Sequence, residues 1–152
     1  MSTYSADQVA DTLLTLARNQ RIEITNLKLQ KLMYYSQAWN LAFTNEALFC
    51  EEFEAWVHGP VIPSLFRRFK HLRWSPIIED VHPVADEKLV GHLGNVITTY
   101  GPATGGQLER LSHSESPWKD ARGDLAPEMP SNAVISKDSI RIFYVGILNA
   151  AR

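Results

Sequence analysis

Apolar residues recur at helical spacing in several separate stretches of this 152-residue chain. In the first stretch, Ser5 and Gln8 have the spacing of a capping box, in which each side chain satisfies a backbone amide of the other residue. Val9, Leu13 and Leu16 follow on one helical face. The pattern predicts a helix that begins after Ser5 and ends near residue 18.

The second stretch, from residue 25 to residue 43, is apolar over most of its circumference. Leu29, Leu32 and Trp39 belong to an inward stripe, and the adjacent Tyr34 and Tyr35 add apolar area outside it. Neighbouring side chains on a helix point in different directions, so we expect at least one of the two tyrosines to be exposed or partly exposed. Such a helix is either central to the fold or partly covered by a partner.

The spacing changes to a period of two between residues 52 and 57, where Phe53 and Ala55 alternate with Glu54 and Trp56. This alternation predicts one short strand. The Gly59-Pro60 pair predicts a sharp turn that ends it. The outer side of the strand, which carries Trp56, is either exposed to a partner or covered by helices, and the pattern does not decide between the two.

The remaining helical segments follow the same rules of capping and spacing. They cover residues 63–72, 86–100, 104–113 and 136–148, with one or two turns at 118–122 after an N-cap at Ser116. The short run Ile77-Ile78 predicts a second small strand. The fold class expected is mainly α (α+β). We expect a single compact helical domain over residues 1–152, of about six helices, with a small antiparallel β element near residues 52–58 and 76–82.

Composition and charge exclude several classes of protein. A hydrophobic fraction of 45% and a charged fraction of 21% are typical of a globular protein. The formal net charge of -2 makes nucleic acid an unlikely partner. The chain has neither a secretory signal nor a run of eighteen apolar residues, so we expect a cytoplasmic protein with no membrane contact.

Residues suited to chemistry are present but scattered. Cys50 cannot form an internal disulfide, and its acidic neighbours favour a buried or half-buried structural thiol. Glu109 and His113 form a helical pair that surface pairing explains better than a metal. No metal or cofactor is therefore expected, and the chain is predicted not to be an enzyme. A hydrolase remains a minor alternative, which requires a pocket where His113 meets a hydroxyl and a carboxylate.

Two charged groups of opposite sign lie near the predicted strand. The acidic group comprises Glu46, Glu51, Glu52 and Glu54, and the basic group comprises Arg67, Arg68, Lys70 and Arg73. The two groups either pair with each other or offer complementary patches to a partner.

Three separated blocks of sequence carry a resemblance to a known family. LQKLMYYSQAW at residues 29–39, EAWVHGPVIPSL at residues 54–65, and LSH at 111–113 with Pro117-Trp118 together resemble the Panacea domain. These are the SocA-like antitoxins, also described as GepA-type phage-associated proteins, and the resemblance extends over residues 6–148. It implies a mostly helical scaffold that neutralises a toxin by direct contact.

The resemblance and the residues together predict an antitoxin of a bacterial or prophage toxin–antitoxin system. Its partner would be a cognate toxin encoded by an adjacent gene. The alternatives are an adaptor that presents a partner protein to a protease, with a protease or chaperone as second partner, and a phage-associated regulatory protein. The predicted toxin-binding residues are Tyr34, Tyr35, Trp56, His58, Gly59, Pro60, Arg67, Arg68 and Lys70.

Overall fold

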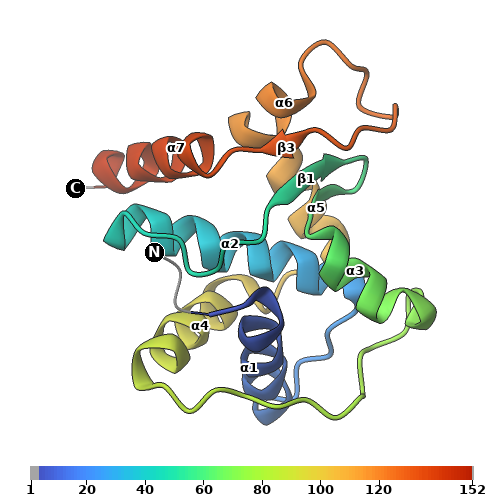
Figure 1. Ribbon diagram of the computed structural model, residues 1–152, viewed down its shortest axis with the longest axis vertical. Coiled ribbons are helices and arrows are strands. Elements are labelled where there is room, and N and C mark those ends of the chain that lie inside the picture. Colours follow the sequence, from blue (N-terminus) through green and yellow to red (C-terminus); the bar gives the residue numbers. More distant parts are fainter. Residues whose placement is uncertain (1–3, 152) are drawn as a thin grey trace.

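Helix α2 (Asn26–Thr44) runs through the middle of the molecule, and the other elements pack around it (Figure 1). The computed structural model describes residues 4–151. The side chain of Thr25 caps α2 by accepting a hydrogen bond from the amide of Lys28. Almost every α2 residue from Lys28 to Ala38 is buried, so this helix is central to the fold.

Helices α1 (Ala6–Asn19) and α4 (Glu87–Tyr100) pack against each other beside α2. The capping box between Ser5 and Gln8 is present, as the sequence predicts. Asp86 caps α4 by accepting from two amides of its first turn. Local side-chain caps therefore fix where α1 and α4 begin. The apolar faces of the two helices form the lower part of the core.

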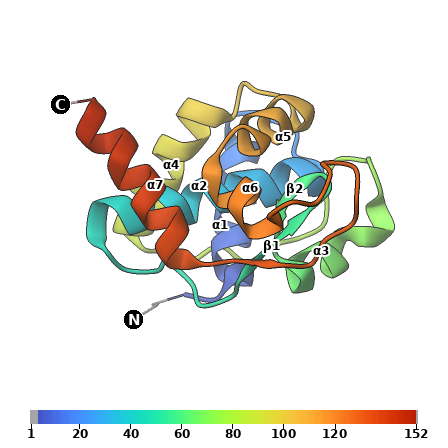
Figure 2. The same ribbon diagram turned by 90° about the horizontal axis from the view of Figure 1, so that it is seen from above.

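Helices α5 (Gly105–His113), α6 (Ser116–Arg122) and α7 (Lys137–Ala150) complete the upper part of the molecule. Thr104 and Ser136 cap α5 and α7. The predicted N-cap of α6 is off by one residue, since Glu115 occupies that position and Ser116 is already helical. Figure 2 shows the end of α7 on one side of the molecule and α3 (Pro63–Phe69) on the other.

The small sheet has the order β2-β1-β3 and is antiparallel throughout. Its strands are β1 (Phe53–Trp56), β2 (Gly59–Val61) and β3 (Val134–Ile135). The second strand predicted near residues 76–82 is wrong, because that segment is irregular. Ile77 is buried there and its amide donates to the Ile24 carbonyl at 2.8 Å. The turn that ends β1 lies at Val57-His58, and the Gly59-Pro60 pair, where the sequence predicted the turn, begins β2.

The tyrosine pair corrects a second expectation, because Tyr34 and Tyr35 are both 0% exposed. Tyr34 packs edge-on against Phe53 of β1, with ring centroids 5.5 Å apart. Tyr35 stacks on Tyr100 of α4 at 4.1 Å. Tyr144 of α7 contacts both tyrosine rings. The two side chains do point in different directions, but α2 is enclosed on both sides.

The fold class predicted from the sequence is confirmed, with seven α-helices within residues 4–151 and one three-stranded antiparallel sheet. The 3-10 turn η1 (Lys70–Leu72) extends α3, so the segment predicted as helix 63–72 is helical throughout. None of the helices in the described part of the chain is long and apolar enough to cross a membrane.

Candidate partner-binding groove

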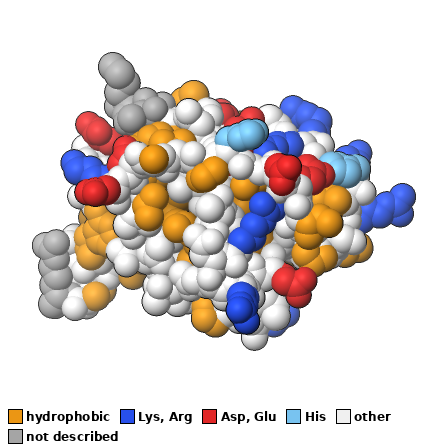
Figure 3. Space-filling model, turned by 90° about the horizontal axis from the view of Figure 1, so that it is seen from below, with side chains coloured by type: hydrophobic (Ala, Val, Ile, Leu, Met, Phe, Trp, Pro, Cys, Tyr) orange, Lys and Arg blue, Asp and Glu red, His pale blue; other side chains and the backbone are white. Residues whose placement is uncertain are grey.

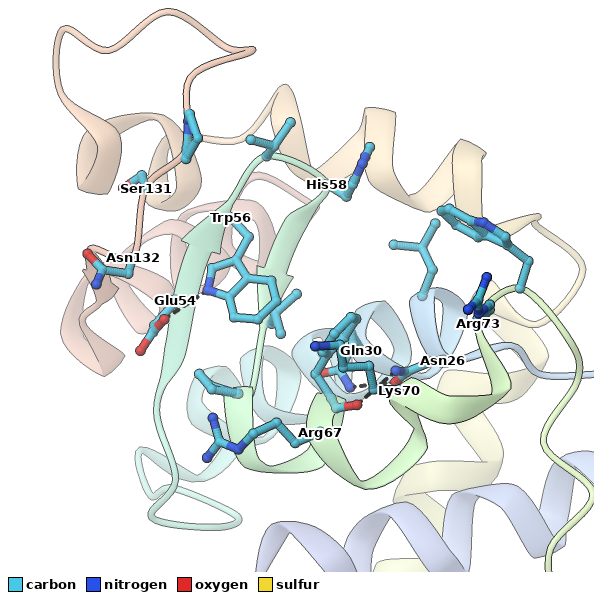
Figure 4. Close-up of a pocket in the computed structure, with 17 residues that line it drawn as sticks. Asn26, Gln30, Glu54, Trp56, His58, Arg67, Lys70, Arg73, Ser131 and Asn132 are labelled. Carbon is cyan, nitrogen blue, oxygen red and sulfur yellow. Dashed lines mark hydrogen bonds between the residues drawn. The ribbon is translucent and has the colours of Figure 1, made fainter.

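An open groove of about 1090 Å³ lies between the outer face of the β1–β2 hairpin and helix α3 (Figure 4). The first turns of α2 form its floor, and residues 130–132, which precede β3, border it at one end. Its walls are mostly apolar. The apolar lining residues are Leu27, Trp56, Val57, Val61, Pro63, Phe66, Trp74 and Pro130.

Two buried amides on α2 fix the floor of the groove to its walls. The Asn26 side chain donates to the Phe66 carbonyl at 3.0 Å, and Gln30 donates to Asn26 at 3.0 Å. Gln30 also accepts from the Ile62 amide at 2.9 Å. Because buried amides that lose a partner destabilise a protein, this chain of bonds holds α2, β2 and α3 in one arrangement. The groove is therefore preformed.

Trp56 forms the wall on the hairpin side. Its indole nitrogen donates to Glu54 at 2.8 Å, and its ring packs against Phe66 with centroids 5.1 Å apart. Behind it, the Trp118 indole donates to the Trp56 carbonyl at 2.8 Å. The outer face of β1 is therefore neither fully exposed nor fully covered, because Trp56 is half-buried against Phe66 of α3 and still lines the groove.

Three cations lie along the α3 side of the groove: Arg67, Lys70 and Arg73. All three are exposed, and none makes an ion pair within residues 4–151. Beside them Trp74 is 72% exposed, an unusual degree for a tryptophan. The groove therefore combines free positive charge with exposed aromatic surface.

Arg68 lies outside the groove although it neighbours Arg67 in sequence. Its guanidinium pairs with Asp11 at 2.7 Å and Asp7 at 3.1 Å, both on α1. The underside of the molecule seen in Figure 3 carries interspersed acidic and basic side chains, in keeping with such local pairing. The predicted acidic group does not pair with the basic group in the described chain. The two ion pairs of Arg68 join α3 to α1.

The hairpin turn rests on a buried lysine. Lys31 is 0% exposed, and its ammonium donates to the Pro60 carbonyl at 3.1 Å. Gly59 has a φ of +103°, and a Cβ there would lie 2.6 Å from Lys31 Cε. Burial lowers the pKa of Lys31 to about 7, which the negative charge of Glu109 partly opposes. Gly59 and Pro60 therefore shape the turn from inside.

The structure divides the predicted site residues into two sets. Four of them line the groove: Trp56, His58, Arg67 and Lys70. The other five are buried or paired elsewhere: Tyr34, Tyr35, Gly59, Pro60 and Arg68. The predicted set lacks Leu27, Phe66, Arg73 and Trp74, which also line the groove. The sequence did contain a sign of two of these residues, because Arg73 and Trp74, an arginine next to a tryptophan, directly follow the basic helix.

No hydrogen bond within the described residues joins His113 to a hydroxyl or a carboxylate, as the hydrolase alternative requires. His113 stacks on Trp118 at 4.0 Å, burial lowers its pKa, and its Nε2 has no hydrogen-bond partner among the described residues. The Ser112 hydroxyl donates to the Glu109 carbonyl. The Glu109 carboxylate lies 3.1 Å from His58 at the hairpin turn, not against His113 as the sequence suggested.

Two further observations concern metals and thiols. No group of three or more His, Cys, Asp or Glu side chains suited to a metal occurs within the described residues 4–151. Cys50 is exposed, which corrects the expectation of a buried or half-buried thiol. Its position follows from the loop between α2 and β1, where Leu48 and Phe49 take the buried positions instead.

Comparison of the sequence with known proteins gives one family match and one similar protein. A family profile described as "Antitoxin SocA-like, Panacea domain" matches residues 29–119, which include most of α2, the hairpin, α3, α4 and α5. Antitoxin SocA of Caulobacter vibrioides (strain NA1000 / CB15N) is 34% identical over 130 residues, which cover 76% of this chain and 69% of that protein. No solved structure gives a significant match. The chain therefore belongs to the Panacea-domain family of SocA-like antitoxins.

Proposed function

We propose that this protein neutralises a cognate toxin by binding it directly, and that the groove between the hairpin and α3 is the surface that contacts the toxin. The toxin would be encoded by an adjacent gene in a bacterial or prophage toxin–antitoxin system. The observation that carries the proposal is the groove itself, where unpaired cations and an exposed tryptophan meet on a member of an antitoxin family.

The composition of the groove suits a protein interface. Tryptophan and arginine supply a large share of the binding energy at protein interfaces, and Trp56, Trp74 and Arg67 lie together here. The bonds of Asn26 and Gln30 hold the walls in place before a partner arrives. A preformed surface loses less conformational entropy on binding, which favours affinity.

The decisive experiment co-expresses the chain with the product of the adjacent gene and measures both growth rescue and binding of the purified proteins. The test variant is Trp74→Ala with Arg67→Glu. Both side chains are exposed, so the fold should be retained. We expect loss of rescue and at least about tenfold weaker binding, the scale on which truncating an interface anchor acts.

The matched control is Phe43→Ala with Arg110→Glu, which removes an exposed aromatic ring and reverses an exposed arginine away from the groove. This control should rescue growth as the wild type does. Undiminished rescue and binding by the groove variant would refute the proposed surface. The half-life of the toxin, measured with and without the antitoxin, separates direct masking from presentation to a protease.

A further inference from the structure

We propose that the groove receives an acidic segment of the toxin, with one large apolar side chain packed beside Trp56 and Phe66 and with carboxylates placed against Arg67, Lys70 and Arg73. The inference rests on the proposed function and specifies the chemistry of the partner. Figure 4 shows Trp56 between the hairpin and α3, with Arg67 and Lys70 along one side and Arg73 at one end.

The positive charge of the groove indicates that the bound segment is negatively charged. The protein as a whole has a formal net charge of -2, yet the groove carries three unpaired cations and one carboxylate, Glu54. That carboxylate already accepts the Trp56 indole hydrogen at 2.8 Å. A partner entering here meets a locally positive surface on a slightly negative protein. Complementary negative charge on the partner would speed association and fix its orientation.

The walls favour a protein segment over a nucleic acid. The groove is also lined by Leu27, Val61 and Phe66, which offer apolar contact to a side chain but no bond to a phosphate. Glu54 lies on the opposite wall, so it would repel a nucleic-acid backbone that follows the whole groove but not a segment whose carboxylates all face the α3 side. Single-stranded nucleic acid is usually held by a basic groove that follows its backbone, and here the cations line one side only.

The outer edge of β2 restricts how the segment can dock. Pro60 has no amide hydrogen, and its carbonyl already accepts from Lys31. The amide of Ile62, the next residue after β2, donates to Gln30. A peptide therefore cannot extend the sheet by pairing along β2, as many peptide ligands do. It must bind through its side chains across the face that carries Glu54 and Trp56.

The test uses the full chain and the toxin from the adjacent gene, with binding measured by calorimetry at several NaCl concentrations. The groove variant is Arg67→Gln with Lys70→Gln and Arg73→Gln. Its matched control neutralises three exposed cations elsewhere: Arg21→Gln with Arg110→Gln and Lys119→Gln. We expect the groove variant to bind about tenfold more weakly and with less dependence on salt, because each exposed pair contributes only a few-fold. The control should match the wild type.

A charge exchange identifies the segment. Hydrogen exchange of the toxin in the complex should show protection of a stretch that contains Asp or Glu beside a large apolar residue. Substituting its carboxylates with Lys should weaken binding to the wild type and restore binding to the variant Arg67→Glu with Lys70→Glu. Restoration of this kind requires direct pairing, which a loss of folding cannot imitate.

The outcomes separate this inference from the function on which it rests. If the wild type does not bind the toxin at all, the proposed function fails first. If the toxin binds and the glutamine groove variant binds equally well with the same salt dependence, this inference alone is overturned. It is also overturned if the protected stretch is basic, if the groove instead binds a labelled single-stranded oligonucleotide, or if the groove variant changes only self-association of the antitoxin.

Discussion

Replacing Lys31 with methionine should change how the stability of the protein depends on pH. Methionine has a similar length without the charge, so the Lys31→Met variant keeps the apolar contacts of the side chain but loses the hydrogen bond to the Pro60 carbonyl, a loss that does not depend on pH in this range. In the folded protein, burial lowers the pKa of Lys31 to about 7, whereas the unfolded chain has the ordinary value of 10.5. Between these values the unfolded state binds the extra proton, so stability rises as pH rises from 7 towards 10.5.

The size of the effect follows from the two pKa values. Integrating the proton difference between pH 7 and pH 9 gives a gain of about 2 kcal/mol in the free energy of unfolding of the wild type. The Lys31→Met variant lacks this gain. Lys28, whose pKa burial also lowers, contributes with the same sign in both proteins and cancels in the comparison. The pKa of His113 is lowered from 6.5, so that group acts below the range tested.

The assay is urea unfolding followed by tryptophan fluorescence at pH 7, 8 and 9. Going no higher than pH 9 limits the contribution of the tyrosines, whose ionisation in the unfolded chain would lower stability at higher pH. A control, Lys119→Met, removes an exposed lysine on α6 and should follow the wild type. A constant difference between Lys31→Met and the wild type across the range would show that the buried ammonium keeps an ordinary pKa, and the reasoning would fail.

Four further substitutions test the hairpin, α6 and α7. Gly59→Ala should lower the free energy of unfolding by at least about 1–3 kcal/mol, the usual cost of a strained backbone, while Gly146→Ala, with no atom near a new Cβ, should raise it by about 0.5–1 kcal/mol. Burial raises the pKa of the folded Glu115 carboxyl to about 7, so the wild type loses stability as pH rises from 4.5 to 7 and this carboxyl loses its proton. The Glu115→Gln variant should not show this loss, which urea unfolding at pH 5 and pH 7 checks. Arg122→Lys should cost about 2–4 kcal/mol and speed hydrogen exchange in residues 124–132, because one ammonium cannot bond both the Ala55 carbonyl of β1 and the carbonyls of that loop.

The helix starts could be predicted from the sequence because capping is local. Ser5, Thr104 and Ser136 each bond an amide three residues further along the chain, so the sequence contains both partners at a fixed spacing. Proline at position 117 also marked a helix start, although it fits the second helical position as well as the first. That ambiguity explains the error of one residue.

Contacts between distant residues could not be predicted in this way. β3 pairs with β1 across about eighty residues, so the spacing in either segment says nothing of the other. The burial of both Tyr34 and Tyr35 depends on Tyr100 and Phe53 arriving from opposite sides of α2. The groove has the same origin, because α2, the hairpin, α3 and the loop before β3 all contribute to it.

The inner side of the hairpin and the groove on its outer side have different roles, which explains why Gly59 and Pro60, two of the five predicted residues outside the groove lining, do not line it. On the inner face, Gly59 lies so close to Lys31 that a side chain added at Gly59 would displace the lysine, which also bonds the Pro60 carbonyl. On the outer side, Arg67 and Trp74 are exposed and bond to nothing that holds the fold within the described residues. Substitutions on the outer side should therefore alter which toxin is bound without changing the melting temperature, whereas inner substitutions should weaken binding only in proportion to lost folding. A groove variant that lost both toxin binding and thermal stability would contradict this division.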